Sequence, residues 1–330
     1  AALGDEAAVE DVLHDFHTMN LVDKVVGEPG GTIEGIRRDK VIAASLRATV
    51  NLDNPAAYDR AGAAPNGADY VRLRDAAGRW LPGSELRSVR FTGAPTLPPR
   101  PLTWSAVDGA LFSGRGHNRD AAAVLPVDVP AGTPALTFRT RHGAEEGYDF
   151  GYVIISVDGG RTYDILPGDR TTDGPLGPGL TGDVVEFETR TYDLSPYAGR
   201  SALIGFRYVT DTAVDRGGWY VDDVAVGGRT VSDGSSVAGL RTPSQIVPPA
   251  VHGWHVRLVG LDAAGRRAKQ VPVSGWAQLR GYPKVVAIVA HDEPTEQVDQ
   301  YAPYVLTVNG FVQPGGGRTE SPTGIGDHDS

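Results

Sequence analysis

Short apolar runs broken by polar positions dominate the chain after its first 40 residues. Residues 136–140, 184–189 and 203–210 show apolar side chains at two-residue spacing, which is typical of strands with one buried face. Residues 152–157 are almost wholly apolar, which predicts a strand buried on both faces. Clusters of Gly, Pro and Asp separate the runs. The pattern predicts a mainly β protein built from antiparallel jelly-roll or β-sandwich modules.

One segment has the spacing of a helix instead. Apolar residues recur three or four positions apart over residues 5–26, which places them on one helix face. Asp5 can cap the start of this helix, and Gly27 and Pro29 end it. The apolar positions are Val9, Val12, Leu13, Phe16 and Met19.

Stretches rich in Pro, Gly and Ser divide the chain into modules. Prolines between residues 95 and 101 predict a stiff linker, and Asp-Ala-Ala-Gly at 75–78 and 262–265 predicts two hairpin turns. The predicted divisions are an N-terminal helix and linker (1–39), a small β module (40–104), a jelly-roll β-sandwich (105–228), a linker (229–249), a C-terminal β domain (250–312) and a disordered tail (313–330).

Composition excludes several classes of protein. The 330 residues carry a net charge of -10 and no cysteine. The charge argues against a nucleic-acid partner, and the missing cysteines exclude disulfides and thiolate metal sites. No run approaches the length of a membrane span. The first residues lack the basic and apolar regions of a signal peptide, so we expect a cytosolic protein or one whose signal peptide has been removed.

A short motif in the central region has a structural interpretation. Residues 156–163 fit the pattern S-x-D-x-G-x-T-[WY], known as an Asp box. The Asp carboxylate and the two hydroxyls can bond turn backbone, the Gly allows positive φ, and the aromatic ring packs under the hairpin. Sialidases carry several copies of this box, whereas this chain has one, so we interpret it as a rigid turn rather than a glycosidase site. Its residues are Ser156, Asp158, Gly160, Thr162 and Tyr163.

Two acidic segments are candidates for a metal site. Residues 145–149 precede the apolar strand, and Asp222 and Asp223 lie within a predicted strand, where a carboxylate needs a partner. Calcium prefers oxygen ligands of this kind. The alternatives are a solvated acidic loop, or an Asp held by Arg207 or by backbone amides.

Catalytic motifs are not found in the sequence. The pairs His14/His17 and His252/His255 lack the spacing and the glutamate of H-E-x-x-H, and no G-x-S-x-G elbow or phosphate loop occurs. We expect the first histidine pair at the surface and the second pair on opposite sides of a strand. The chain alone is therefore not expected to cleave peptide bonds or to hold zinc.

Several blocks of the sequence together resemble a known family. The blocks are residues 111–118, 136–138, 145–153, 156–163, 203–211 and 218–224. In order and spacing they are similar to the non-catalytic, MAM-like jelly-roll region of the immune inhibitor A family, a family of secreted bacterial zinc metallopeptidases. Residues 254–310 resemble the small β domain that follows this region.

The resemblance implies a secreted accessory region stabilised by calcium. Its calcium ligands would be Glu146, Asp149, Asp222 and Asp223. The family's peptidase motif has no counterpart here, so no catalytic residue is carried over, although the parent protein would be a zinc metallopeptidase. The implied partners are the peptidase domain of the same precursor or a protein or glycan surface.

Two other functions stay open at this stage. The first is a stand-alone jelly-roll module that binds carbohydrate or protein, which an upstream H-E-x-x-H in the same precursor would argue against. The second is a carboxylate-dependent hydrolase using residues 145–149 and 222–223, which requires two carboxyl groups close together in an open cleft.

Overall fold

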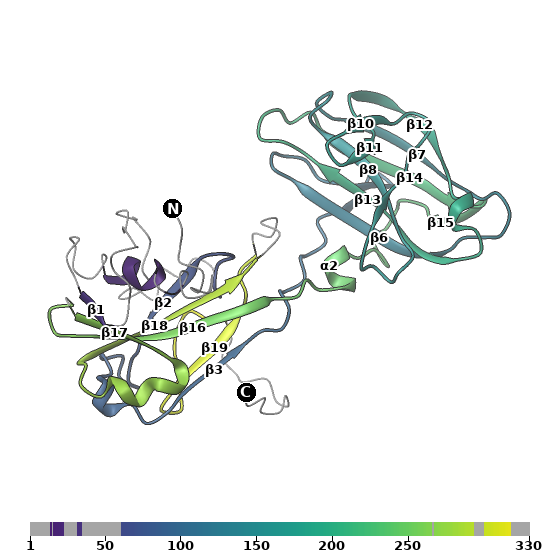
Figure 1. Ribbon diagram of the computed structural model, residues 1–330. Coiled ribbons are helices and arrows are strands. Elements are labelled where there is room, and N and C mark those ends of the chain that lie inside the picture. The colour runs from purple at the N-terminus through teal and green to yellow at the C-terminus, as the bar shows by residue number, and fades with distance from the viewer. Residues whose placement is uncertain are drawn as a thin grey trace, which may run out of the picture. The chain divides into compact units, whose positions relative to one another are not determined.

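The computed structural model describes residues 14, 16–22, 32–34, 61–265, 267–293 and 300–317. They fall into two compact units (Figure 1). Unit 1 combines Ala1–Pro98 with Ala250–Ser330, and unit 2 is Pro99–Pro249. Both are built from sheets that are almost entirely antiparallel, which confirms the predicted mainly β fold.

Unit 2 is a sandwich of two sheets. One sheet has the order β12-β7-β14-β5-β4, with β15 added to β14, and the other has the order β6-β13-β8-β9. The strands are β4 (Ser105–Val107), β5 (Ala110–Phe112), β6 (Asp120–Asp128), β7 (Ala135–Gly143), β8 (Phe150–Ser156), β9 (Asp164–Ile165), β12 (Asp183–Asp193), β13 (Ser201–Val209), β14 (Gly218–Val226) and β15 (Arg229–Ser232). Between β12 and β13 lies a 3-10 helix, Ser195–Tyr197.

Aromatic side chains fill the space between these sheets. Trp219 is fully buried and meets Phe206 edge-on, with ring centroids 5.5 Å apart. Its Nε1 donates to Thr140 Oγ1 at 2.7 Å, so the indole has its partner inside the core. Gly151 lies beneath the same ring, where a Cβ would come within 2.8 Å of it. The two sheets therefore close around Trp219 only because position 151 has no side chain.

Strand β8 is buried along its whole length, as its apolar run predicts. Its inner face joins the sandwich core, and its outer face packs against a short hairpin of β10 (Thr172–Gly174) and β11 (Gly177–Gly179). Gly174 and Gly179 lie directly on the rings of Phe150 and Tyr152. The segment between β9 and β12 thus contains a hairpin that covers the sheet.

The second predicted linker is part of unit 2. Residues 229–249 contain β15 and a short helix, α2 (Pro243–Ile246), which begins with a capping box formed by Thr242 and Gln245. Leu240 is buried in the sandwich core, with Val231 and Val237 packed against it. The prediction of a linker is wrong here because these spaced apolar residues are enough to hold the segment against the sheets.

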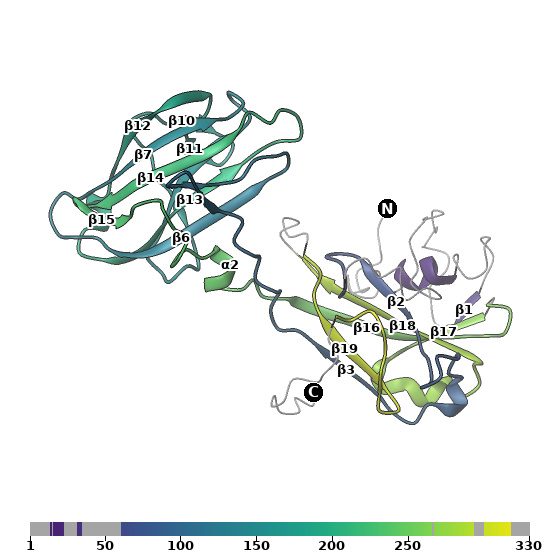
Figure 2. The same ribbon diagram turned by 180° about the vertical axis from the view of Figure 1, so that it is seen from behind.

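Unit 1 pairs a five-stranded sheet with a three-stranded one (Figure 2). The first has the order β1-β17-β16-β18-β2, and the second β20-β19-β3. The strands are β1 (Thr32–Glu34), β2 (Ala68–Arg72), β3 (Val89–Gly93), β16 (His252–Leu261), β17 (Arg267–Pro272), β18 (Lys284–Asp292), β19 (Tyr304–Val308) and β20 (Phe311–Val312), with 3-10 helices at Gly83–Glu85 and Val273–Leu279. The predicted turn at 262–265 joins β16 to β17.

The two outer modules of the prediction share these sheets. β2 pairs with β18, and β3 pairs with β19, so residues from 40–104 and from 250–312 form one unit rather than two. Sequence patterns report the local strand but not its partner, and the partners here lie more than 200 residues away. The structure corrects the predicted division at this point.

The described helical residues, 14 and 16–22, lie against the five-stranded sheet. Met19 is buried there as predicted, whereas Phe16 is exposed. His14 and His17 are buried, which contradicts the expected surface position. His14 meets His255 of β16 edge-on at 5.2 Å between ring centroids. The rest of the predicted helix over 5–26 lies outside the described residues, as does most of the chain between 23 and 60.

The first residues of the predicted disordered tail are packed against unit 1. Gln313 is buried, and its amide accepts from Arg74 N at 2.8 Å and donates to Arg74 O at 3.1 Å. Tyr304 N donates to Gly316 O at 2.7 Å. Residues 313–317 are therefore part of unit 1, because their backbone completes its sheets, and the remaining tail residues lie outside the description.

Candidate functional site: the loop end of unit 2

Three loops meet at one end of the unit 2 sandwich. Register places Val209 opposite both Asp120 and Phe150, and Gly218 opposite Gly143. The loops that follow or precede these residues must therefore lie together. We call this set the loop end, and it comprises residues 113–119, 144–149 and 210–217.

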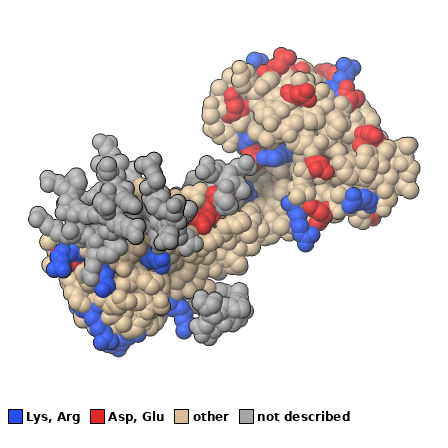
Figure 3. Space-filling view, viewed as in Figure 1, with Lys and Arg blue, Asp and Glu red and all other residues tan. Residues whose placement is uncertain are grey.

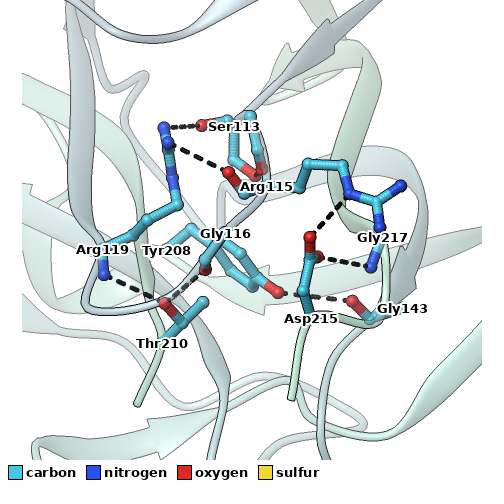
Figure 4. Close-up of polar contacts among 10 residues, drawn as sticks. Ser113, Arg115, Gly116, Arg119, Gly143, Tyr208, Thr210, Asp215 and Gly217 are labelled. Carbon is cyan, nitrogen blue, oxygen red and sulfur yellow. Dashed lines mark hydrogen bonds and ion pairs between the residues drawn. The ribbon is translucent and has the colours of Figure 1, made fainter. Parts of the chain in front are cut away.

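A guanidinium group holds the first of these loops closed (Figure 4). Arg119 donates through Nη2 to Ser113 O at 2.8 Å and through Nη1 to Arg115 O at 3.3 Å. Thr210 Oγ1 donates to Gly116 O at 2.8 Å and accepts from Arg119 N at 3.0 Å. Backbone carbonyls that converge in a loop would otherwise face water or a cation. Here the chain's own side chains satisfy them.

A buried carboxylate ties the other two loops together. Asp149 is 1% exposed. Its Oδ1 accepts from Asp211 N at 3.1 Å, and its Oδ2 accepts from Glu145 N at 3.3 Å. Thr181 Oγ1 adds a bond to Glu145 O at 3.1 Å. Asp149 is therefore held by backbone amides, one of the alternatives that the sequence left open.

The outer surface of the loop end carries charges of both signs. Arg115 Nε donates to Asp215 Oδ2 at 2.8 Å, and Arg216 Nη1 lies 3.4 Å from Asp183 Oδ2. Figure 3 likewise shows acidic and basic side chains interspersed over the visible face of unit 2. The hydrogen bond from Arg115 is the main cause that holds the pKa of Asp215 below its ordinary value. These pairs are exposed and add more to loop geometry than to stability.

The second acidic segment lies elsewhere. Asp222 is opposite Arg139 in the β14–β7 pairing, four residues along β7 from Gly143, or roughly 13 Å at strand spacing. Arg139 Nη1 lies 3.5 Å from Asp222 Oδ2 and 3.6 Å from Asp223 Oδ2. Asp223 has φ 49° in an irregularity of β14. The expected meeting of the two acidic segments is wrong, because β14 runs away from the loop end before it reaches them.

The predicted calcium ligands therefore do not form one site. Asp149 is engaged by amides, Asp222 and Asp223 share an arginine, and Glu146 is exposed. Among the described residues, no three His, Asp or Glu side chains are placed to hold a metal ion. The residues present do not fit the four-carboxylate site that the resemblance implies.

The Asp box forms a dense turn. Asp158 accepts from Thr162 Oγ1 at 2.7 Å, from Ser156 Oγ at 2.8 Å and from Arg161 N at 2.9 Å. These bonds, led by that from Thr162, hold the pKa of Asp158 well below its usual range. Gly160 has φ +91°, and a Cβ there would approach the Tyr163 hydroxyl to 3.0 Å. The box thus fixes the turn, and Gly160 leaves room for the Tyr163 hydroxyl beside it.

Sequence reasoning missed the two residues that organise the loop end, Arg119 and Thr210. The available signal was the spacing of Gly114 and Gly116, both of which adopt positive φ, before an arginine. Two such glycines predict a tight loop whose carbonyls turn inward. The step that was not made was to expect the Arg119 guanidinium to donate to those carbonyls.

Comparison with known proteins identifies the central segment. Residues 103–238 match the family model described as "Immune inhibitor A-like, MAM domain". A stretch of 176 residues, 51% of the chain, is 27% identical to Bacillopeptidase F of Bacillus subtilis and covers 11% of that protein. A stretch of 133 residues, 38% of the chain, is 31% identical to the pre-pro-metalloprotease PrtV of Vibrio cholerae and covers 14% of it. The chain therefore spans a small part of these relatives, and the resemblance expected from the sequence is confirmed.

Within the part of the chain that is described, no helix is both long and apolar enough to cross a membrane.

Proposed function

Since residues 103–238 form an immune inhibitor A-like MAM domain, we propose that this chain is the non-catalytic accessory and binding region of a secreted metallopeptidase precursor. The match to this domain is the observation that carries the proposal. The pre-pro-metalloprotease among the relatives supports the peptidase context and secretion.

The architecture supports a binding role over a catalytic one. A hydrolase of the carboxylate type needs two carboxyl groups facing each other in an open cleft. Asp149 is buried with amides on both oxygens, and Asp222 is paired with Arg139, so neither is free to act as an acid or a base. Rigid loops on a sheet scaffold are instead what recognition surfaces use.

The loop end is our candidate for the contact with a peptidase domain. Tyr148 is 62% exposed on a loop that the Asp149 and Thr181 hydrogen bonds hold still. An aromatic side chain presented on a fixed backbone loses little freedom on binding, and such residues are common interface anchors. Val185 on β12 is also exposed, at 78%, and provides a matched position outside these loops.

The proposal can be tested with the full chain and the peptidase domain encoded in the same precursor. Surface plasmon resonance should show saturable binding that Tyr148→Ser weakens more than Val185→Ser does. A precursor without H-E-x-x-H upstream, or no binding to the peptidase domain, would favour the stand-alone binding module. Chelator-sensitive proteolysis by the purified chain alone would overturn the non-catalytic assignment.

A further inference from the structure

A cavity of about 460 Å³ lies on the outer face of the four-stranded sheet of unit 2. Ala122 of β6, Ile154 of β8 and Ile165 of β9 line it from the sheet, and residues of the segments 100–103 and 242–244 line it from outside the sheet. All of its lining residues belong to unit 2, and none belongs to the loop end. The volume is in the range of small-ligand sites.

The sheet side of this cavity is apolar. Ala122 and Ile165 are only half-buried, so part of their surface is left uncovered on the outer face. Tyr163 contributes its ring, because its hydroxyl is buried beside Gly160. Uncovered apolar surface costs free energy in water, and a ligand with an apolar face would remove part of that cost.

A charge-balanced ion pair forms a polar side of the cavity. Arg207 donates to Asp120 through Nε and Nη2, each at 2.7 Å, and the two side chains are 34% and 50% exposed. Nη1 of Arg207 takes no part in these bonds, and each carboxylate oxygen can accept a second hydrogen bond. A bidentate pair has a fixed geometry. It therefore presents donors and acceptors in fixed positions without a net charge.

The wall outside the sheet is held in place by hydrogen bonds. Arg100 N donates to Ser244 Oγ at 2.9 Å, and Thr242 Oγ1 donates to Arg100 O at 2.9 Å. Thr242 also caps α2, which ties this wall to a helix. A preorganised site loses less free energy when it binds.

These two sides together select the class of ligand. A charged ligand gains little from an ion pair that is already neutralised, and a wholly apolar ligand would cover the pair without bonding it. A neutral ring with C–H groups on one face and hydroxyl groups at its edge matches both sides. A hydroxyl group donates and accepts, so it can bond to the carboxylate and to the guanidinium. Pyranose sugars are built in this way.

We propose that this cavity binds a neutral saccharide, with the C–H face of one pyranose ring on Ala122 and Ile165 and its hydroxyl groups bonded to the Asp120–Arg207 pair. The proposal goes beyond the proposed function, since it requires neither a peptidase domain nor a residue of the loop end. Such a site would give the chain affinity for glycan surfaces in addition to a peptidase contact.

The test titrates the full chain with neutral disaccharides, namely cellobiose, maltose, lactose and N,N′-diacetylchitobiose. Nuclear magnetic resonance should show saturable shifts of the Ala122 and Ile165 amides with at least one of them, half-saturated below roughly 5 mM. Asp120→Asn removes the carboxylate of the pair and should weaken that binding roughly tenfold. Asp128→Asn is the matched control, because it removes an exposed carboxylate at the other end of β6 and should change nothing.

Several results would overturn the assignment. They are no saturable shift with any of these disaccharides up to roughly 20 mM, or equal affinity in the Asp120→Asn and Asp128→Asn chains. Equal or stronger binding of the neutral peptide acetyl-Ala-Ala-Leu-amide would show that the cavity does not recognise hydroxyl groups. Ala122→Leu fills the sheet side and should abolish binding, and an unchanged melting temperature would distinguish loss of the site from loss of the fold. Binding to the peptidase domain is measured separately, so failure here leaves the proposed function intact.

Discussion

Replacing Arg119 with methionine tests whether an internal cation closes the loop end. The guanidinium donates to Ser113 O at 2.8 Å and to Arg115 O at 3.3 Å, and it lies in a partly buried position. A partly buried hydrogen bond from a charged donor contributes about 1.5–3 kcal/mol, and the longer bond is exposed and adds little. Methionine keeps much of the side-chain length but leaves both carbonyls without this donor. We expect a loss of about 2–3 kcal/mol.

Calorimetry of the full chain measures this loss. For a unit of about 150 residues, 1 kcal/mol moves the melting temperature by about 2–4 °C, so the transition of unit 2 should fall by about 5–10 °C. Arg161→Met is the matched control, because it removes the same charge and an exposed bond from Nη1 to Asp158 O at 3.0 Å. That change should stay within about 0.5 kcal/mol.

Hydrogen exchange locates the effect. Asn118 N donates to Asp211 O at 2.6 Å across two loops, and this amide should lose protection in the Arg119→Met chain. If Arg119→Met and Arg161→Met lower the transition equally, or if the Asn118 amide keeps its protection, the guanidinium does not close the loop and the reasoning is wrong.

Three further results are expected. Thr140→Val removes the acceptor of the buried Trp219 Nε1 at unchanged shape, and chemical denaturation should show a loss of about 1–3 kcal/mol. Burial, with His255 nearby, lowers the pKa of His17 to about 4, so the folded state favours the neutral ring; stability is full above the unfolded value of 6.5 and falls as pH drops from 6.5 to 4. Lowering the pKa from 6.5 to about 4 corresponds to about 3 kcal/mol, and a His17→Gln chain should show a flatter stability profile over that range. Calcium-dependent stability stays a prediction: if calcium binds the loop end, the melting temperature in calcium should exceed that in EDTA, and Asp149→Ala should remove the difference, whereas identical curves for the unaltered chain would reject calcium.

Local patterns predicted local structure well. The apolar run at 152–157 was expected to be buried on both faces, and β8 is buried throughout. Strand β18 shows why such runs are reliable: it lies between the three-stranded sheet and the helical residues 16–22, so every residue from Val285 to His291 is buried. A continuous apolar run of this length is stable mainly where both faces of the strand are buried.

Partners across the chain were not predictable in the same way. The pairing of β2 with β18 joins residues more than 200 positions apart, and no periodicity reports it. The buried positions of His14 and His17 follow from what lies opposite them, including His255 and Tyr70. Sequence spacing alone had suggested a solvent-facing pair.

The candidate site shows the same limit. Clustered acids in the sequence predicted a metal, yet the register of β14 gives Asp222 and Asp223 to Arg139. Nothing in the sequence distinguishes Arg119 from a surface arginine. Only the folded loop shows that its guanidinium donates to Ser113 O and Arg115 O. The sequence shows which charged side chains need a partner, whereas the fold determines which partner each of them has.

The division of unit 1 into two stretches of chain has a consequence for how the protein is made. Unit 2 is inserted between β3 and β16, and its flanks stay close within unit 1, where Val251 N donates to Pro95 O at 3.0 Å. During synthesis, unit 2 is complete once residue 249 has left the ribosome. Unit 1 must wait, because β2 and β3 have no partners until β18 and β19 are translated. Unit 2 is therefore expected to fold first. Its folding brings together the two unit 1 segments that flank it, and unit 1 then folds from these segments.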